Sequence, residues 1–235
     1  MSKYLLIHGA SHGGWCWEKI KTQLESMGHQ VIAPDLPGHS IPLEIKPAKI
    51  TLETYISFIT RILFDSKDKV ILVGHSMGGA VITGAAEIAF STIEQIIYVC
   101  AYVPRHGERI HDLLQADKGS KLKFKINEKD MQAEPAVIED IINAIYNGCS
   151  EEDITFASSR LVPEPLIPVM TPIVLPQEKF KSVERIGIVC TEDQAITPEY
   201  QKKMYEEAGC KIRTLNSGHS PFFSKASELT QILSN

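Results

Sequence analysis

The stretch that decides the fold is Val70-Ile71-Leu72-Val73-Gly74-His75-Ser76-Met77-Gly78, an apolar run that ends in a Gly-x-Ser-x-Gly pentapeptide. The run predicts a buried strand, and Gly79-Ala80-Val81-Ile82 directly after it begins a helical pattern. Glycines on both sides of a serine are typical of a tight strand-to-helix turn, because side chains there would collide. Such a turn would present the Ser76 hydroxyl as a nucleophile and leave the Met77 amide at a helix N-terminus. The alternative interpretation is a tight turn whose small serine caps a helix.

Short apolar runs alternate with amphipathic segments along most of the chain, which predicts βαβ units around a mostly parallel sheet. Strands are expected at Lys3–His8, Gln30–Pro34, Lys69–Gly74, Ile93–Cys100, Ser182–Cys190 and Lys211–Asn216. Helices are expected at Trp15–Met27, Thr51–Asp65, Met77–Ala89, Pro198–Ala208 and Pro221–Leu233. The expected strands are largely apolar without regular polar alternation, as strands covered by helices on both faces are.

Residues 104–181 interrupt this alternation. A helix-like segment spans Pro135 to Tyr146, and a cluster of prolines follows it. The prolines are Pro163, Pro165, Pro168, Pro172 and Pro176. This density excludes a sheet core or a long helix. We therefore expect one domain, in which residues 1–103 and 182–235 form the α/β core and residues 104–181 form a small inserted helical cap.

A serine nucleophile needs a histidine base and an acid, which should follow it in the chain. Asp193 and His219 each come directly after an expected strand, so both would lie with Ser76 beyond the carboxyl ends of parallel strands. His219 would then take the serine proton, and Asp193 would orient the imidazole. The neighbouring Glu192 is an alternative candidate for the acid. Only one of the two carboxylates can point at His219. We favour Asp193.

The loop His8-Gly9-Ala10 follows the first expected strand and supplies a candidate second oxyanion donor, the Ala10 amide. A plain glycine-rich turn is the alternative. The loop has neither the Gly-x-Gly-x-x-Gly spacing nor a Gly-Lys-Ser/Thr end, which argues against phosphate binding. His8 and His12 are four residues apart, but His8 ends a strand and the chain has no His-Glu-x-x-His helix. We therefore expect no metal and no cofactor.

Composition excludes several functional classes. The 235 residues carry a net charge of −5, which argues against nucleic-acid binding. The longest apolar stretch, Ile96–Val103, is too short to span a bilayer, and no signal-peptide layout precedes the first expected strand. Five widely spaced cysteines without a Cys-x-x-Cys pair predict inert thiols. We expect a cytoplasmic protein that contacts neither nucleic acid nor membrane and could form a homodimer.

Several segments together resemble an α/β-hydrolase, and within that fold the methylesterase and hydroxynitrile lyase family known best from plants. They are Leu5–Trp15, Gly28-His29, Ala33–His39, Val70–Gly79, Cys190–Asp193, Pro198–Gln201 and Gly218-His219. The resemblance covers most of the first hundred residues and the last fifty. It implies a triad and an oxyanion hole that agree with the assignments above. The implied residues are Ser76, Asp193 and His219, with the backbone amides of Ala10 and Met77.

The resemblance also bears on the choice between two chemistries. The lyases of the family carry a glutamate immediately before the nucleophile and a lysine immediately after the catalytic histidine. Here those positions are His75 and Ser220. Without a cation beside His219, a departing cyanide would lack its stabilising charge, so the esterase branch is favoured.

The sequence therefore predicts a serine carboxylic-ester hydrolase that forms an acyl-enzyme with small to medium, fairly apolar esters. A small-molecule ester is the expected partner. One alternative is a lyase acting on cyanohydrin-like substrates with the same triad, and another is a non-hydrolytic receptor for small hydrophobic molecules. Four aromatic residues are candidates for the apolar pocket, although such side chains are more often ordinary core. They are Tyr102, Phe124, Tyr146 and Phe156.

Overall fold

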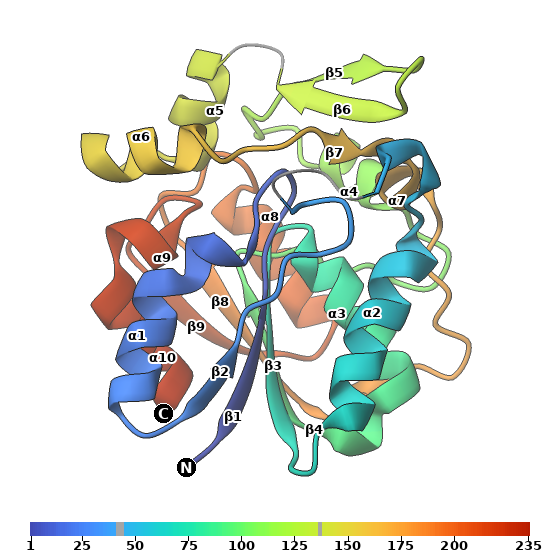
Figure 1. Cartoon of the computed structure of the whole chain (residues 1–235), viewed down its shortest axis with the longest axis vertical. Helices are drawn as coiled ribbons and strands as arrows, with labels where there is room; N and C mark the ends of the chain where they lie inside the picture. The colour runs from blue at the N-terminus through green and yellow to red at the C-terminus, as the bar shows by residue number, and fades with distance from the viewer. Residues whose placement is uncertain (41–44, 136–137) are drawn as a thin grey trace.

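A computed structural model describes residues 1–40, 45–135 and 138–235 of the chain. Its main sheet has six parallel strands in the order β2-β1-β3-β4-β8-β9 (Figure 1). The bounds are β1 (Lys3–Ile7), β2 (Gln30–Ile32), β3 (Val70–His75), β4 (Ile93–Val99), β8 (Glu184–Cys190) and β9 (Lys211–Leu215). All six lie where the apolar runs predict strands, so the expected α/β architecture is confirmed.

Helices cover both faces of this sheet (Figure 1). The helices on one face are α2 (Leu52–Asp65), α3 (Gly78–Ala89) and α8 (Pro198–Glu207). Those on the other are α1 (Glu18–Ser26), α9 (Pro221–Ser224) and α10 (Ala226–Ser234). The single helix expected at Pro221–Leu233 is two helices, because Lys225 leaves the helical region at φ −140° and ψ 41°. None of the described helices is long and apolar enough to cross a membrane.

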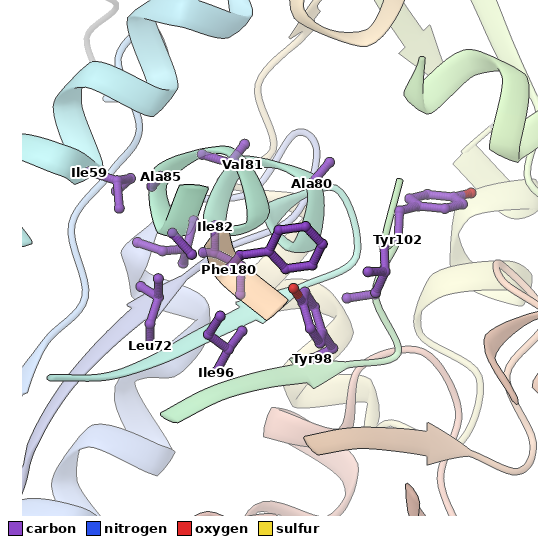
Figure 2. Close-up of a cluster of buried hydrophobic side chains, with 14 of the residues drawn as sticks. Ile59, Leu72, Ala80, Val81, Ile82, Ala85, Ile96, Tyr98, Tyr102 and Phe180 are labelled. Carbon is purple, nitrogen blue, oxygen red and sulfur yellow. The ribbon is translucent and has the colours of Figure 1, made fainter. Parts of the chain in front are cut away.

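The core between the sheet and the helices α2 and α3 holds the serine motif in place. Figure 2 shows Val81 and Ala85 of α3 above Leu72 of β3 and Ile96 of β4. Almost every residue of α3 is buried, since this helix lies between the sheet and α2. Close packing on both sides fixes the N-terminus of α3, which is where the serine motif lies.

The segment 104–181 has its described α-helices and short strands across the carboxyl end of the main sheet (Figure 1), whereas its last residues pack against α3. It contains the helices α4 (Ile110–Ala116), α5 (Ile138–Ile145), α6 (Glu151–Ser158) and α7 (Leu166–Met170). It also contains an antiparallel sheet in the order β5-β6-β7, formed by β5 (Phe124–Asn127), β6 (Gln132–Pro135) and β7 (Glu164–Pro165). The expectation of a helical cap did not include this sheet. Its strands have four, four and two residues, which is too short for an alternating pattern to stand out.

Short 3-10 helices complete the described secondary structure. They are η1 (Gly14–Trp17), η2 (Pro47–Lys49), η3 (Phe90–Thr92) and η4 (Lys179–Ser182). The prolines of the cap fit their places, because Pro165 ends β7, an edge strand where a missing amide hydrogen costs little.

Candidate active site

The serine motif forms a tight turn between β3 and α3. Ser76 has a φ of 52°, a left-handed conformation that strains a residue with a side chain. A Cβ on Gly74 would lie 2.8 Å from the carbonyl oxygen of Gly78, and one on Gly78 would lie 2.5 Å from that of His8. Both distances are shorter than real Cβ contacts, so only glycine allows the backbone to close this turn.

The loops after β8 and β9 bring two side chains to Ser76. His219 Nε2 lies 3.0 Å from Ser76 Oγ, and His219 Nδ1 lies 2.7 Å from Asp193 Oδ2. A neutral imidazole that donates from Nδ1 to the carboxylate leaves Nε2 free to accept the serine hydroxyl hydrogen. Ser76 is 8% exposed, His219 2% and Asp193 4%, so this chain of hydrogen bonds is shielded from water.

The carboxylate of Asp193 is fixed on both oxygens. Its Oδ1 accepts hydrogen bonds from the Ala195 and Ile196 amides at 2.7 and 3.0 Å. Its Oδ2 accepts a further bond from Gln201 Nε2 at 2.8 Å, beside the bond from His219. Gln201 is itself buried and accepts from the Cys190 amide at 3.0 Å. The sequence interpretation gave Gln201 no role, although it lies one helical turn after the expected start of α8.

Glu192, the rival acid, is exposed in the structure. Its carbonyl oxygen accepts a hydrogen bond from Asn147 Nδ2 at 2.8 Å, which ties this loop to the cap. Asp193 is therefore the carboxylate that faces His219.

His75 packs against His219 and is hydrogen-bonded to its backbone. Its Nε2 lies 2.8 Å from the His219 carbonyl oxygen, and the two rings are 4.7 Å apart between centroids. Burial, with the neighbouring His219 as a smaller cause, holds the pKa of His75 well below its usual value. A neutral His75 donates this hydrogen bond and fixes the backbone of His219. The sequence analysis foresaw no role for His75 beyond the absence of the lyase glutamate.

The loop after β1 also lies beside Ser76. Ala10 and Met77 line one cavity together with Ser76, so the two expected oxyanion donors belong to residues at this cavity. His12 Nδ1 donates to the Ala10 carbonyl oxygen at 2.7 Å, and Tyr146 donates its hydroxyl hydrogen to His12 Nε2 at 2.8 Å. Burial lowers the pKa of His12 to about 4, which keeps this ring neutral.

Two narrow cavities, of about 20 and 50 Å³, reach Ser76. Leu122 and Phe124 of the cap line both of them. Beside polar residues, Ile141, Ile145 and Leu161 line the smaller cavity, and Ile110, Leu114 and Val169 line the larger one. A groove of about 550 Å³ on the outside shares Leu122 and Phe124 with both cavities. These two side chains therefore separate the serine from the outer groove.

The four candidate pocket aromatics have different places. Tyr102 and Phe124 line the larger cavity with Ser76. The Tyr102 hydroxyl points away from the core in Figure 2 and has no hydrogen-bond partner among the described residues. Tyr146 reaches the site only through His12.

Phe156 lies outside both cavities. Its ring packs edge-on against Trp15 and Phe223, with centroids 5.8 and 6.3 Å away, and the Arg160 guanidinium lies 3.8 Å from its centroid. The structure thus corrects the expectation that Phe156 lines the pocket. It belongs to a core cluster beneath α6, because the apolar side of α6 faces this cluster and not the serine.

Among the described residues, one group has donor atoms close enough to hold a metal ion, and it comprises His75, Cys100 and His219. Both ring nitrogens of His219 are already hydrogen-bonded to Ser76 and Asp193. A metal ligand there would break the arrangement described above, so we assign no metal to it.

A serine on a strand-to-helix turn, with a histidine and an aspartate from later loops at the carboxyl end of a parallel sheet, defines the class of α/β hydrolases. A model of the alpha/beta hydrolase family matches residues 4–231. The chain belongs to this family and, within it, to the methylesterases.

Some of the relatives match this chain over nearly their whole length. Methylesterase 7 of Arabidopsis thaliana is 32% identical over 98% of this chain and 94% of its own. A carbendazim hydrolyzing esterase of a Nocardioides species is 27% identical over 99% of this chain and 98% of its own. The structure of a methylesterase from Arabidopsis superposes with a TM-score of 0.86 at 28% identity, covering 100% of this chain and 98% of that one. The chain is therefore a hydrolase of the esterase type.

Proposed function

We propose that the protein hydrolyses small to medium apolar carboxylic esters through an acyl-enzyme on Ser76, with His219 as base and Asp193 as its orienting acid. The observation that carries this proposal is the hydrogen-bonded series from Asp193 through His219 to Ser76 at 2.7 and 3.0 Å. Each distance lies within the reach that proton transfer requires.

In the first half-reaction, Ser76 Oγ attacks the ester carbonyl carbon while its proton moves to His219 Nε2. The carbonyl oxygen becomes an oxyanion, which the Ala10 and Met77 amides would stabilise. The bond from carbon to the alcohol oxygen then breaks, and His219 returns its proton to that oxygen. The alcohol leaves and the acyl group stays on Ser76.

In the second half-reaction, a water molecule takes the place of the alcohol. His219 removes one proton from the water as its oxygen attacks the acyl carbon. The ester bond to Ser76 Oγ breaks, and the proton returns from His219 to the serine oxygen. The carboxylic acid leaves, and the enzyme is restored with one water consumed.

The walls of the two cavities support an apolar substrate of modest size. Aliphatic side chains of the cap line part of each cavity, and together the cavities offer room for only a few atoms before side chains move. Leu122 and Phe124 are the side chains whose displacement would admit an ester from the outer groove. The names of the relatives, methylesterases and a carbendazim hydrolyzing esterase, agree with ester hydrolysis.

The test is the hydrolysis of p-nitrophenyl acetate and butyrate by the purified protein, with fluorophosphonate labelling read by intact mass. Wild type should turn over and gain one label. Ser76→Ala should do neither, with a loss of about 10⁶-fold in kcat, and Asp193→Asn should lose about 10⁴-fold. A folded wild type that neither turns over nor labels would refute the proposal. Cyanide release from a cyanohydrin, in place of ester turnover, would favour the lyase.

A further inference from the structure

A buried carboxylate of the cap lies beside the proposed oxyanion loop. Glu164 of β7 is 1% exposed and lines the larger cavity together with Ser76 and Ala10. Its Oε2 accepts hydrogen bonds from the Ser11 amide at 2.7 Å and from His39 Nε2 at 2.9 Å, and its Oε1 accepts one from the Tyr55 hydroxyl at 3.2 Å. A buried carboxylate is costly without such partners, so its position needs an explanation beyond packing.

Ser11 is the residue that this carboxylate holds. Its φ of 61° is a left-handed conformation, which persists only where the surroundings fix it. The cap supplies both backbone partners: Glu164 accepts from the Ser11 amide, and the Val162 amide donates to the Ser11 carbonyl oxygen at 3.0 Å. The bonds from the Ser11 amide to Glu164 and from His12 to the Ala10 carbonyl fix the peptide that joins Ala10 to Ser11, and this peptide adjoins the one that carries the Ala10 amide.

The Glu164 carboxylate faces a buried histidine, His39, within the same cluster. An unpaired carboxylate at this cavity would oppose the negative charge that develops on an ester oxygen. The His39 side chain is fully buried against Glu164. Burial disfavours its protonation, but the charge and the hydrogen bond of Glu164 prevail, so the pKa of His39 is raised. With His39 held against its Oε2, the Glu164 carboxylate can serve as a fixed hydrogen-bond acceptor beside the site.

We propose that Glu164 is a positioning residue of the esterase reaction, through which the docked cap holds Ser11 and so aims the Ala10 amide at the oxyanion. The oxyanion hole is then complete only when β7 is seated on the loop after β1. This inference rests on the proposed function. It assigns Glu164 a role in stabilising the transition state, with no part in proton transfer.

Two substitutions separate the reach of Glu164 from its charge. Glu164→Asp keeps the charge beside His39 but withdraws the carboxylate by one methylene from the Ser11 amide. Glu164→Gln keeps the length and an acceptor oxygen for Ser11, while its amide group can face the Tyr55 oxygen. Tyr55→Phe is the matched control, because it removes a partner of Oε1 and leaves the bond from Oε2 to Ser11 in place.

The measurements are kcat and KM for p-nitrophenyl butyrate, and the inhibition constant of phenylboronic acid, which forms a tetrahedral adduct with an active-site serine. Losing one oxyanion donor typically costs about 10²–10³-fold in kcat. We expect Glu164→Asp to lower kcat by about 10²-fold with KM nearly unchanged. The inhibition constant of phenylboronic acid should rise by a similar factor. Glu164→Gln and Tyr55→Phe should stay within about tenfold of wild type in both.

Several outcomes would overturn the inference. One is a Glu164→Asp variant with wild-type kcat, and another is a loss confined to KM. A third is the reverse order, with Glu164→Gln inactive and Glu164→Asp active, since charge alone would then matter. Circular dichroism and thermal unfolding of each variant show that the comparison is made on folded protein. A wild type without ester turnover would refute the proposed function itself, whereas an active wild type with an active Glu164→Asp refutes only this role.

Discussion

Replacing His12 should make the protein less sensitive to acid. The ring is fully buried, with Nδ1 donating to the Ala10 carbonyl and Nε2 accepting from Tyr146. Its pKa is lowered to about 4 because burial disfavours the charged form. In the unfolded chain the same ring has its ordinary pKa near 6.5. Protons therefore bind the unfolded state more readily, and the free energy of unfolding falls as the pH drops through this window.

The size of the effect follows from the two pKa values. For a group with pKa 6.5 in the unfolded state and about 4 in the folded state, proton linkage removes about 2 kcal/mol between about pH 6.5 and pH 4.5. His12→Asn keeps an amide nitrogen that can donate to the Ala10 carbonyl but has no group that titrates. We expect its free energy of unfolding to change by about 2 kcal/mol less than that of wild type over this range.

Urea unfolding followed by circular dichroism at several pH values measures this difference. The comparison uses slopes against pH, so any constant loss of stability from the smaller side chain drops out. His8 and His75 also have pKa values lowered by burial, and they steepen the pH dependence of both proteins equally. Tyr146→Phe is the control, since it removes a hydrogen bond to His12 and leaves the titrating ring. Parallel slopes for wild type and His12→Asn would refute the reasoning.

Three further predictions concern stability and the cavity. Gly78→Ala should lower the free energy of unfolding by about 1–3 kcal/mol in urea titration, because its Cβ would meet the His8 carbonyl. Gln201→Met should lower the melting temperature by several degrees in calorimetry, since Asp193 and the Cys190 amide each lose a buried partner. Tyr102→Phe should not lower the melting temperature, because its buried hydroxyl is unpaired, and steady-state kinetics should show a lower KM for apolar esters.

The central sheet and the grouping of the site residues could be predicted because both depend on local patterns. Most strands of the main sheet contain short apolar runs, and each candidate catalytic residue lies in the turn or loop after one of these strands. Parallel strands place all such residues at the same edge. The positions of Ser76, Asp193 and His219 after three of these strands are therefore enough to predict that the three side chains lie close together.

The contacts of the cap could not be predicted in this way. Glu164 lies 153 residues from Ser11 and 125 from His39 in the sequence, and nothing in its proline-rich surroundings indicates a partner. The three-stranded sheet that carries Glu164 has strands too short to show a period. The expectation that Phe156 lines the pocket was wrong because it too depended on contacts of the cap. The apolar character of a helix indicates that one side is buried, but not whether that side meets a substrate cavity or the core.

Burial disfavours the charged form of every buried histidine around the site, but the charge that each one faces differs. His12 and His75 lie near His219, where a second positive charge would oppose the imidazolium of the proposed mechanism. Their low pKa values keep them neutral, so they serve as uncharged hydrogen-bond partners. His39 faces the Glu164 carboxylate instead, whose charge and hydrogen bond outweigh burial and raise the pKa of His39. The neighbouring charge therefore decides in which direction the pKa of each buried histidine moves.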